Sequence, residues 1–451
     1  MAKEHTAFDF GSGSTLKIIF RLAPPVMLAQ LIQAMYNIID SFFIGRFSEE
    51  GLTALSIIYP IQLLMIALGV GTGVGINTLM AHYLGIDRKK RSDDCAGIGP
   101  SLAISMWLIF AFICYIIMPA YAEMSTSSAK IIEYTISYGR IVSVFSIGLF
   151  AESVWTKVLQ AEGNMKTPMI AQIIGAIVNI ILDPILIWGF RKIPSLGIAG
   201  AAYATVIGQI AAALIVMPKG FRKPPNIKFY WAYIKLIYKY GFPNMLMHAA
   251  YTFYILGLNL ILKTFSDQAV TVLGLYYKWQ TFFFIPLGAM QTCIVPIISY
   301  NYASGKYERC GKTLKNAIAV GMALMFLGTL CFEFLPAQLL SVFSKDELVI
   351  QIGRIAFRII GLSFIPMSTS LIFPVFFQAI GSPLKSSALT ILRTVVLFVP
   401  LGWLFSRIGL NYFWTTFPAT DTITTILGII FYMAFLREHS LTQVYSTEDD
   451  E

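Results

Sequence analysis

Two stretches of this chain, 218 residues apart, have closely similar sequences. The segment LKIIFRLAPPVML at residues 16–28 matches IKLIYKYGFPNML at residues 234–246. The same offset relates QAEG at 160–163 to QAIG at 378–381. One ungapped offset over so much of the chain indicates two homologous halves. Internal repeats of this kind are a common construction of membrane transporters.

The composition places both halves in a membrane. The chain is 57% hydrophobic and 13% charged, with a mean hydropathy of +0.70, and a spanning helix needs about 20 mostly apolar residues. Apolar runs of that length predict an all-α integral membrane protein with twelve transmembrane helices in two homologous six-helix bundles. The helices are expected at residues 16–45, 52–83, 96–119, 130–160, 167–190 and 197–217, and at residues 234–263, 270–302, 312–335, 347–380, 385–406 and 409–436.

The repeat divides the chain into three parts. Residues 1–217 are predicted to form an N-terminal six-helix lobe, residues 218–233 a cytoplasmic linker, and residues 234–451 a C-terminal six-helix lobe with a short polar tail. Basic residues gather in the loops on the side of the termini, most clearly at 88–91, which predicts that both termini are cytoplasmic. We therefore expect a multi-pass protein of the cell (inner) membrane. The net charge of +9 reflects this topology and does not indicate nucleic-acid binding.

Several kinds of chemistry find no support in the sequence. The five cysteines and four histidines show no spacing typical of a disulfide framework or a metal site. The sequence Gly311-Lys312-Thr313 lacks the glycine that a phosphate-binding loop needs at position 306, which is Lys306. We therefore expect no enzyme, no metal and no cofactor other than a coupling ion, with an ion gradient as the energy source. The glycine-rich run at 69–75 is interpreted as close helix packing.

Acidic residues inside the predicted spans are the sharpest functional signal, because an ionised carboxylate in hydrocarbon costs at least about 2.5–3.5 kcal/mol on insertion scales. Asp40 in the first helix follows Asn37 by three residues, and Asp183 in the fifth follows Asn179 by four, so each acid shares a helical face with an amide. The two carboxylates could share a proton or coordinate a sodium ion. Alternatively, Asp40 caps a broken helix and Asp183 ends a helix before Pro184. The predicted spans contain three further acids, Glu152, Glu333 and Asp421.

Four stretches around these residues carry a family resemblance. They are YNIIDSFFIG at 36–45, QAEGN at 160–164, NIILDPILIWG at 179–189 and GIAGAAYAT at 197–205. In order and spacing they resemble the multidrug and toxic compound extrusion (MATE) family, of the multidrug/oligosaccharidyl-lipid/polysaccharide exporter superfamily, over the whole chain. The resemblance implies a MATE-type fold. It also implies a proton- or sodium-coupled antiporter that exports organic compounds, often cationic or amphipathic, by alternating access.

Within this family the chain is similar to the DinF-like branch, which places its essential carboxylates on the first and fifth helices, where Asp40 and Asp183 stand. The predicted seventh, eighth and tenth helices have no acidic residue deep in a span, unlike those of the NorM branch. The resemblance implies that Asp40 is the principal protonation site. It also implies that Asn179 and Asp183 complete its polar network, with Thr205 as a further member, and that Pro25 lies where the first helix bends.

A broad substrate cleft is predicted from polar, aromatic and methionine side chains in the spans, namely Gln33, Tyr36, Trp155, Lys278, Trp279 and Met290. A lysine within a span is unusual. Lys278 could be neutralised by a carboxylate, bind an anionic substrate, or extend its amine to the outer interface. Arg393 presents the same ambiguity.

The closest alternative function is that of a flippase for lipid-linked precursors, from the same superfamily. Such proteins usually add helices or a strongly cationic cleft, and here only Lys278 and Arg393 enter the spans. A channel or a membrane sensor is a second alternative, but the sequence contains no filter motif and no soluble signalling domain. The expected partners are small organic substrates and the lipid bilayer, with no nucleic acid, and the protein is expected to be a monomer.

Overall fold

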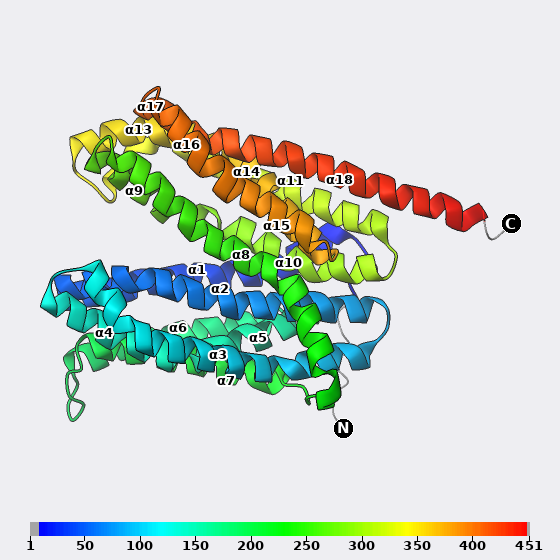
Figure 1. Cartoon of the computed structure of the whole chain (residues 1–451), viewed down its shortest axis with the longest axis horizontal. Coiled ribbons are helices and arrows are strands. Elements are labelled where there is room, and N and C mark those ends of the chain that lie inside the picture. The colour runs from blue at the N-terminus through cyan, green and yellow to red at the C-terminus, as the bar shows by residue number, and fades with distance from the viewer. Residues whose placement is uncertain (1–8, 449–451) are drawn as a thin grey trace. The chain divides into compact units, whose positions relative to one another are not determined.

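The computed structural model describes residues 9–448, with the side chains of residues 9–438. Within this range every regular element is a helix, and the only strand-like pairing is an isolated bridge between Phe190 and Ile193 (Figure 1). The predicted all-helical fold is therefore confirmed. The end of the predicted polar tail, residues 449–451, lies outside the described residues.

The helices of the first half follow the predicted segments closely. They are α1 (Thr15–Phe47), α2 (Glu49–Gly85), α3 (Lys89–Ser125), α4 (Ala129–Val144), α5 (Ile147–Ala161), α6 (Lys166–Trp188) and α7 (Ile198–Gly220).

The second half repeats this order with more interruptions. Its elements are η1 (Ile227–Phe229), α8 (Tyr230–Lys263), α9 (Asp267–Phe283), α10 (Ile285–Ala303), α11 (Tyr307–Phe334), α12 (Pro336–Ser341), α13 (Glu347–Gly361), α14 (Phe364–Ala379), α15 (Pro383–Ile391), the π-helical turn η2 (Leu392–Leu397), α16 (Phe398–Ser406), α17 (Leu410–Phe413) and α18 (Thr416–Glu448).

By length and composition, nine helices of the described chain could cross a membrane, or up to twelve if each of three bent pairs counts as one span. The predicted continuous helices 130–160, 270–302 and 347–380 are wrong in this respect. They are broken into α4 and α5, bent by 43°, α9 and α10, bent by 50°, and α13 and α14, bent by 54°.

Local chemistry accounts for these breaks. At the first and third breaks, the hydroxyls of Ser146 and Ser363 donate to the carbonyls of Ser143 and Ile360, each at 2.7 Å, where a helical N–H would otherwise bond. At the second break, Pro286 stands in the first turn of α10, where its missing N–H costs nothing. Because the serine breaks fall at nearly equivalent places in the two halves, the bend is part of the repeated unit.

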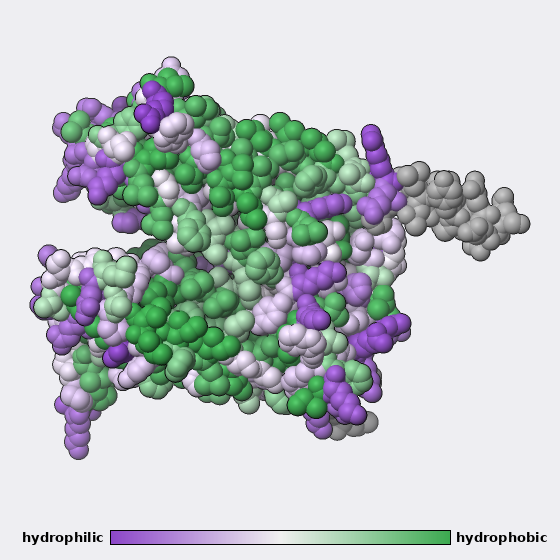
Figure 2. Space-filling model, in the orientation of Figure 1, coloured by the Kyte–Doolittle hydropathy of each residue, from purple (hydrophilic) through white to green (hydrophobic). Residues whose placement is uncertain are grey.

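The surface has the character of a membrane protein. Figure 2 shows hydrophobic residues over the middle parts of the helices and hydrophilic residues gathered at their ends. Large apolar side chains such as Phe112, Phe253 and Leu260 are 68–69% exposed. Exposure of this extent is unfavourable in water but favourable in a lipid environment, so the chain is a multi-pass membrane protein.

The described chain forms two compact units whose boundaries do not fall in the predicted linker. Of the described residues, unit 1 contains 9–10 and 21–249, and unit 2 contains 11–20 and 250–448. The start of α1 therefore packs with unit 2, and the first part of α8 packs with unit 1. The predicted linker, 218–233, holds the end of α7, η1 and the start of α8.

The glycine-rich run of α2 packs against two other helices. Gly71 and Gly75 face α8, where a methyl group on Gly75 would collide with the carbonyl of Ile237, and one on Gly241 would collide with the carbonyl of Gly71. Gly69 and Gly73 face α5 instead, next to its residues 149–157. The run therefore permits close helix packing on two faces, as predicted.

Candidate functional site

Four of the predicted coupling residues meet inside unit 1, contributed by three helices. Asp40 lies on α1, Asn179 and Asp183 on α6, and Thr205 on α7, and their exposed fractions are 6%, 2%, 0% and 6%. The Asn179 amide nitrogen is 3.4 Å from Asp183 Oδ1 and 3.5 Å from Thr205 Oγ1, and donates to both. Asn179 thus joins α6 to α7 through a buried polar contact.

The helices pass straight through the acids. Asp183 lies within α6, which continues past Pro184 to Trp188, and Asp40 lies seven residues before the end of α1 at Phe47. The alternatives in which Asp40 caps a broken helix and Asp183 ends one are therefore wrong. Both carboxylates are buried within apolar helices, where burial has to be offset by a specific use or partner.

Asp40 and Asp183 are close enough for their charges to interact, and two tyrosines complete their surroundings. Tyr36, one turn before Asp40, faces both acids. Tyr138 of α4 is 1% exposed, also faces Asp40, and has its hydroxyl within hydrogen-bonding reach of Thr205. Tyr138 could not be singled out from the sequence, because one aromatic residue in an apolar helix resembles an ordinary core residue.

The cluster contains more acceptors than donors. Asp40 Oδ1, Asp183 Oδ2 and Asn179 Oδ1 are buried oxygens that have no hydrogen-bond partner among the described atoms. A buried polar atom without a partner costs free energy. All three could be satisfied by an added donor, either a proton on a carboxyl group or a cation with oxygen ligands. No cluster of three or more His, Cys, Asp or Glu side chains suited to a metal ion occurs in the described part of the chain.

Two predicted residues of α1 point away from this cluster. Gln33 and Asn37, four residues apart, are exposed, whereas Tyr36 and Asp40, also four apart, face inward. Residues four apart share a face of α1 here, and residues three apart do not. Asn37, three residues before Asp40, therefore lies on a different face from Asp40. Asn37 does not join the buried network.

The other predicted cleft residues lie in separate places. Trp155 packs in unit 1 against Gly220 at the end of α7. In unit 2, Met290 is 2% exposed, and Trp279 donates from Nε1 to the carbonyl of Leu339 at 3.0 Å. The exposed Lys278 places its amine 5.0 Å from the ring centre of Phe343, so it is not neutralised by a carboxylate.

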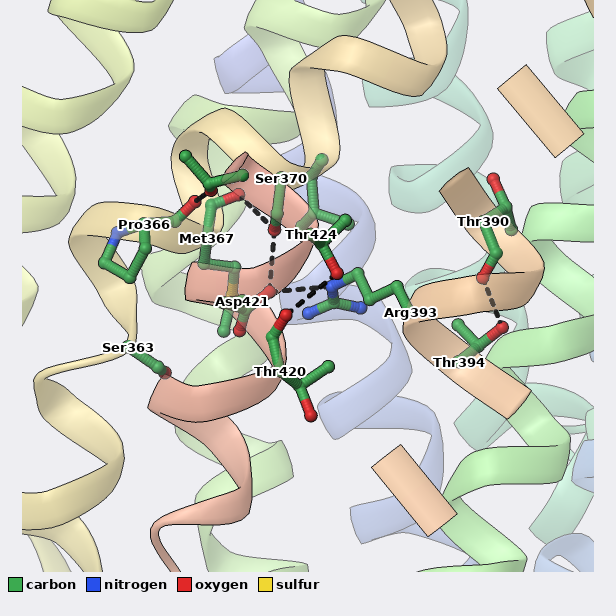
Figure 3. A network of polar contacts seen from close by, with 12 residues as sticks. Ser363, Pro366, Met367, Ser370, Thr390, Arg393, Thr394, Thr420, Asp421 and Thr424 are labelled. Atoms are coloured by element: carbon green, nitrogen blue, oxygen red, sulfur yellow. Dashed lines mark hydrogen bonds and ion pairs between the residues drawn. The ribbon is translucent and has the colours of Figure 1, made fainter. Parts of the chain in front are cut away.

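Unit 2 has a different buried polar network, which the sequence did not reveal (Figure 3). Arg393, in the π-helical turn η2, donates from Nε to Asp421 Oδ1 on α18 at 2.7 Å, and Ser370 of α14 donates to the same oxygen at 2.6 Å. Arg393 is 5% exposed and Asp421 is fully buried. Of the three possibilities for Arg393, the structure shows neutralisation by a carboxylate.

The two remaining acids have ordinary partners. Glu152 of α5 accepts hydrogen bonds from Thr156 at 2.7 Å and from Gln172 of α6 at 3.5 Å. Glu333 lies 3.8 Å from Arg358 in a surface ion pair. Neither acid belongs to the cluster around Asp40.

Duplicated bundles of apolar helices with a buried carboxylate pair define an integral membrane transporter, not an enzyme. The chain belongs to the MatE family, whose model matches residues 25–185 and again residues 243–404. The two matches are displaced by the same 218 residues as the internal repeat.

Curated relatives and solved structures agree with this assignment. The chain is 24% identical over 436 residues to the multidrug export protein MepA of Staphylococcus haemolyticus (strain JCSC1435), covering 95% of each protein. It resembles a solved outward-facing multidrug resistance MATE transporter of the MOP superfamily with a TM-score of 0.88, at 21% identity, covering 95% of this chain and 97% of that one. A MATE crystallised with MaL6 gives a TM-score of 0.89, at 21% identity, with 98% and 100% covered. At such identities the structural likeness shows the fold alone.

Proposed function

We propose that the protein is a multidrug efflux antiporter that exports small organic compounds, often cationic or amphipathic, in exchange for protons or sodium ions. The observation that carries the proposal is the group of three buried, unpartnered oxygens on Asp40, Asp183 and Asn179. A bound proton or cation gives these oxygens a bonding partner, and its loss leaves them buried without one, which costs free energy. The relatives named for multidrug export support the same substrate class.

Asp40 is the principal coupling group in this proposal. With the site open to the outside, Asp40 takes a proton from the side of high proton concentration. Loss of its charge removes the repulsion from Asp183 and changes its contacts with Asn179, and the accompanying bend of α1 near Pro25 expels the substrate. Return of the site to the cytoplasmic side releases the proton. Sodium is the alternative ion for the same pair of carboxylates.

The equivalent positions of the second half support a single coupling site. The repeat places Leu258 opposite Asp40 and Leu401 opposite Asp183. Leu258 is fully buried and its side chain packs against Gly402, next to Leu401. Unit 2 therefore has apolar leucine side chains at the positions where unit 1 has its two acids. At these repeated positions only unit 1 has carboxylates that could bind the coupling ion. This asymmetry favours assignment to the DinF-like branch.

The lipid-linked precursor flippase is less well supported. A cationic cleft would be needed to hold an anionic lipid headgroup. The two candidate cations are engaged elsewhere, because Arg393 is paired with Asp421 and the amine of Lys278 lies over Phe343.

Topology and assembly complete the proposal. The exposed basic run at 88–91 and its counterpart around Lys306 and Arg309 lie at the starts of α3 and α11, which we place on the cytoplasmic side, together with both termini. The transporter would act as a monomer in the plasma membrane, with residues 1–217 and 234–451 as its two homologous six-helix halves and 218–233 as the cytoplasmic linker.

Transport in proteoliposomes tests the function and its ion together. We expect efflux of a cationic dye to be driven by an imposed pH gradient, or by a sodium gradient, applied separately. Collapse of the effective gradient with an ionophore should stop the efflux. If dye leaves equally fast with neither gradient, or if a labelled lipid-linked precursor is translocated and no dye is, the antiporter assignment is wrong.

Pro25 should matter for the conformational step. A proline inside a helix frees a carbonyl and permits a bend, and α1 contains Pro24 and Pro25 in its first half. Replacing Pro25 by alanine should slow dye efflux while leaving dye binding in detergent unchanged. Pro24→Ala is the matched comparison, and transport by Pro25→Ala at the wild-type rate would rule out the bending role.

A further inference from the structure

Each compact unit holds the segment that leads into the first helix of the other half. Residues 11–20, which we call the amino-terminal strap, pack with unit 2, although α1 belongs to unit 1 from Arg21 onward. Residues 222–249, which we call the central strap, pack with unit 1, although α8 belongs to unit 2 from Ala250 onward. The 218-residue repeat relates residues 11–20 to residues 229–238 of the central strap, so the attachments of these two segments can be compared.

The amino-terminal strap is held by polar side chains of unit 2. Lys306 donates to the carbonyl of Gly11 at 3.0 Å, and Arg309 donates to the carbonyl of Gly13 at 2.6 Å and also to that of Ser12. Asn316 of α11 donates to the hydroxyl of Thr15 at 2.7 Å. The bonds of Lys306 and Arg309 are exposed, so water can replace them. The strap also buries Thr15, Ile18 and Ile19, which are 0–7% exposed.

The central strap is held in part by an ion-pair network. Arg222 lies 2.6 Å from Glu162 and 3.5 Å from Asp93. Further along the strap, the hydroxyl of Tyr230 is 3.4 Å from that of Ser101 on α3. These contacts correspond in kind to the polar contacts of the amino-terminal strap.

The central strap is also held by backbone packing. Gly71 and Gly75 of α2 allow the backbone of α8 to approach closely at Ile237 and Gly241, and a methyl group at any of these glycines would collide with α8 or α2. Contact of this kind rests on van der Waals packing between closely approaching backbones, which is lost when the helices separate.

The repeat places larger residues at the corresponding positions. The counterparts of Gly71 and Gly75 are Ala289 and Cys293, and the counterpart of Gly241 is Ala23. Each carries side-chain atoms where the first half has none. In agreement with this, α1 leaves unit 2 after Phe20, whereas α8 stays with unit 1 as far as Ala249.

We propose that the amino-terminal strap is a releasable latch of the transport cycle and that the central strap is a permanent joint. Lys306, Arg309 and Asn316 hold the start of α1 in one state of the cycle and let it go in the other, while α8 remains attached to α2 throughout. This inference rests on the proposed alternating-access function. It assigns a positioning role to three residues that take no part in the coupling site.

Reversible cross-linking tests the latch. The variant Thr15→Cys/Asn316→Cys places two thiols where a side-chain hydrogen bond now joins the strap to α11. A short bis-methanethiosulfonate reagent should link them and reduce dye efflux to background, and a reducing agent should restore the rate. The matched control is Ser101→Cys/Tyr230→Cys, which links the central strap to α3 across its own side-chain contact and should leave efflux unchanged. Mass spectrometry establishes the extent of linkage in each protein.

Two outcomes would overturn the proposal. Unchanged efflux by the fully cross-linked Thr15→Cys/Asn316→Cys protein would show that the strap need not detach. Equal loss of efflux on cross-linking both pairs would show that neither attachment is special. Loss of gradient-driven efflux in the reduced proteins and the wild type alike would instead count against the antiporter function. In that case maleimide labelling of Thr15→Cys still tests the latch, and labelling no faster than that of Tyr230→Cys would contradict it.

Discussion

Replacing Asp40 by asparagine should abolish gradient-driven efflux and leave the protein folded. The substitution keeps the shape of the side chain but removes the group that gains and loses a proton. Asp40 is 6% exposed with one unpartnered oxygen, so losing its charge should not lower stability. We expect dye efflux at the background of empty proteoliposomes, with an unchanged size-exclusion profile and helical circular dichroism signal. Asp183→Asn should have the same direction of effect.

The control for this prediction is Glu49→Gln, which removes an exposed carboxylate at the start of α2. It should transport as the wild type does. If Asp40→Asn extrudes dye against a gradient as well as the wild type, Asp40 is not the coupling group. A defect of equal size in Glu49→Gln would mean that loss of any negative charge in unit 1 impairs transport.

Of the substitutions predicted here, those that break the Arg393–Asp421 ion pair should lower the free energy of unfolding the most. Removing one partner of a buried ion pair leaves an uncompensated charge, which typically costs about 3–5 kcal/mol. Arg393→Met and Asp421→Leu should each therefore lower the thermal unfolding temperature in detergent strongly. The double variant should recover most of the loss, because two apolar side chains leave no buried charge behind.

The exposed pair of Lys312 and Glu308, at 2.6 Å, provides the comparison. Glu308→Gln should change the unfolding temperature very little, because exposed pairs are screened by water and salt. If the Arg393→Met/Asp421→Leu protein is as unstable as the worse single variant, the network of Figure 3 does more than neutralise a charge. In that event the bond from Ser370 to Asp421 would be the next contact to test.

The sequence predicted the helical segments because apolar length is a strong and local signal. It did not predict the breaks at 145–146, 284 and 362–363, since the apolar runs continue through them. The serines at two of these breaks bond to carbonyls three residues earlier, and a serine of this kind leaves the hydropathy of the run almost unchanged. The extent of α8 within unit 1 was missed for a related reason, because packing partners are not visible along a single chain.

The members of the coupling site that could be predicted are those whose charge makes burial in an apolar helix energetically costly. Asp40 and Asp183 are charged residues in apolar helices, so each was identified by itself. Tyr138 was not identified, since aromatic side chains are common in apolar helices. Arg393 and Asp421 were each noticed, but their pairing was not, because they lie 28 residues apart on different elements.

The exchange of the two straps has a consequence for the ancestry of the chain. A protein made of one half alone would expose the glycine surface formed by Gly71 and Gly75, because the segment that covers it comes from the other half. Two identical copies could cover each other's glycine surface by exchanging their first helical segments, which is domain swapping in a symmetric dimer. Fusion of the two genes would place both exchanged segments within a single chain. The fused copies were then free to diverge, one keeping glycines for a tight joint and the other accepting alanine and cysteine.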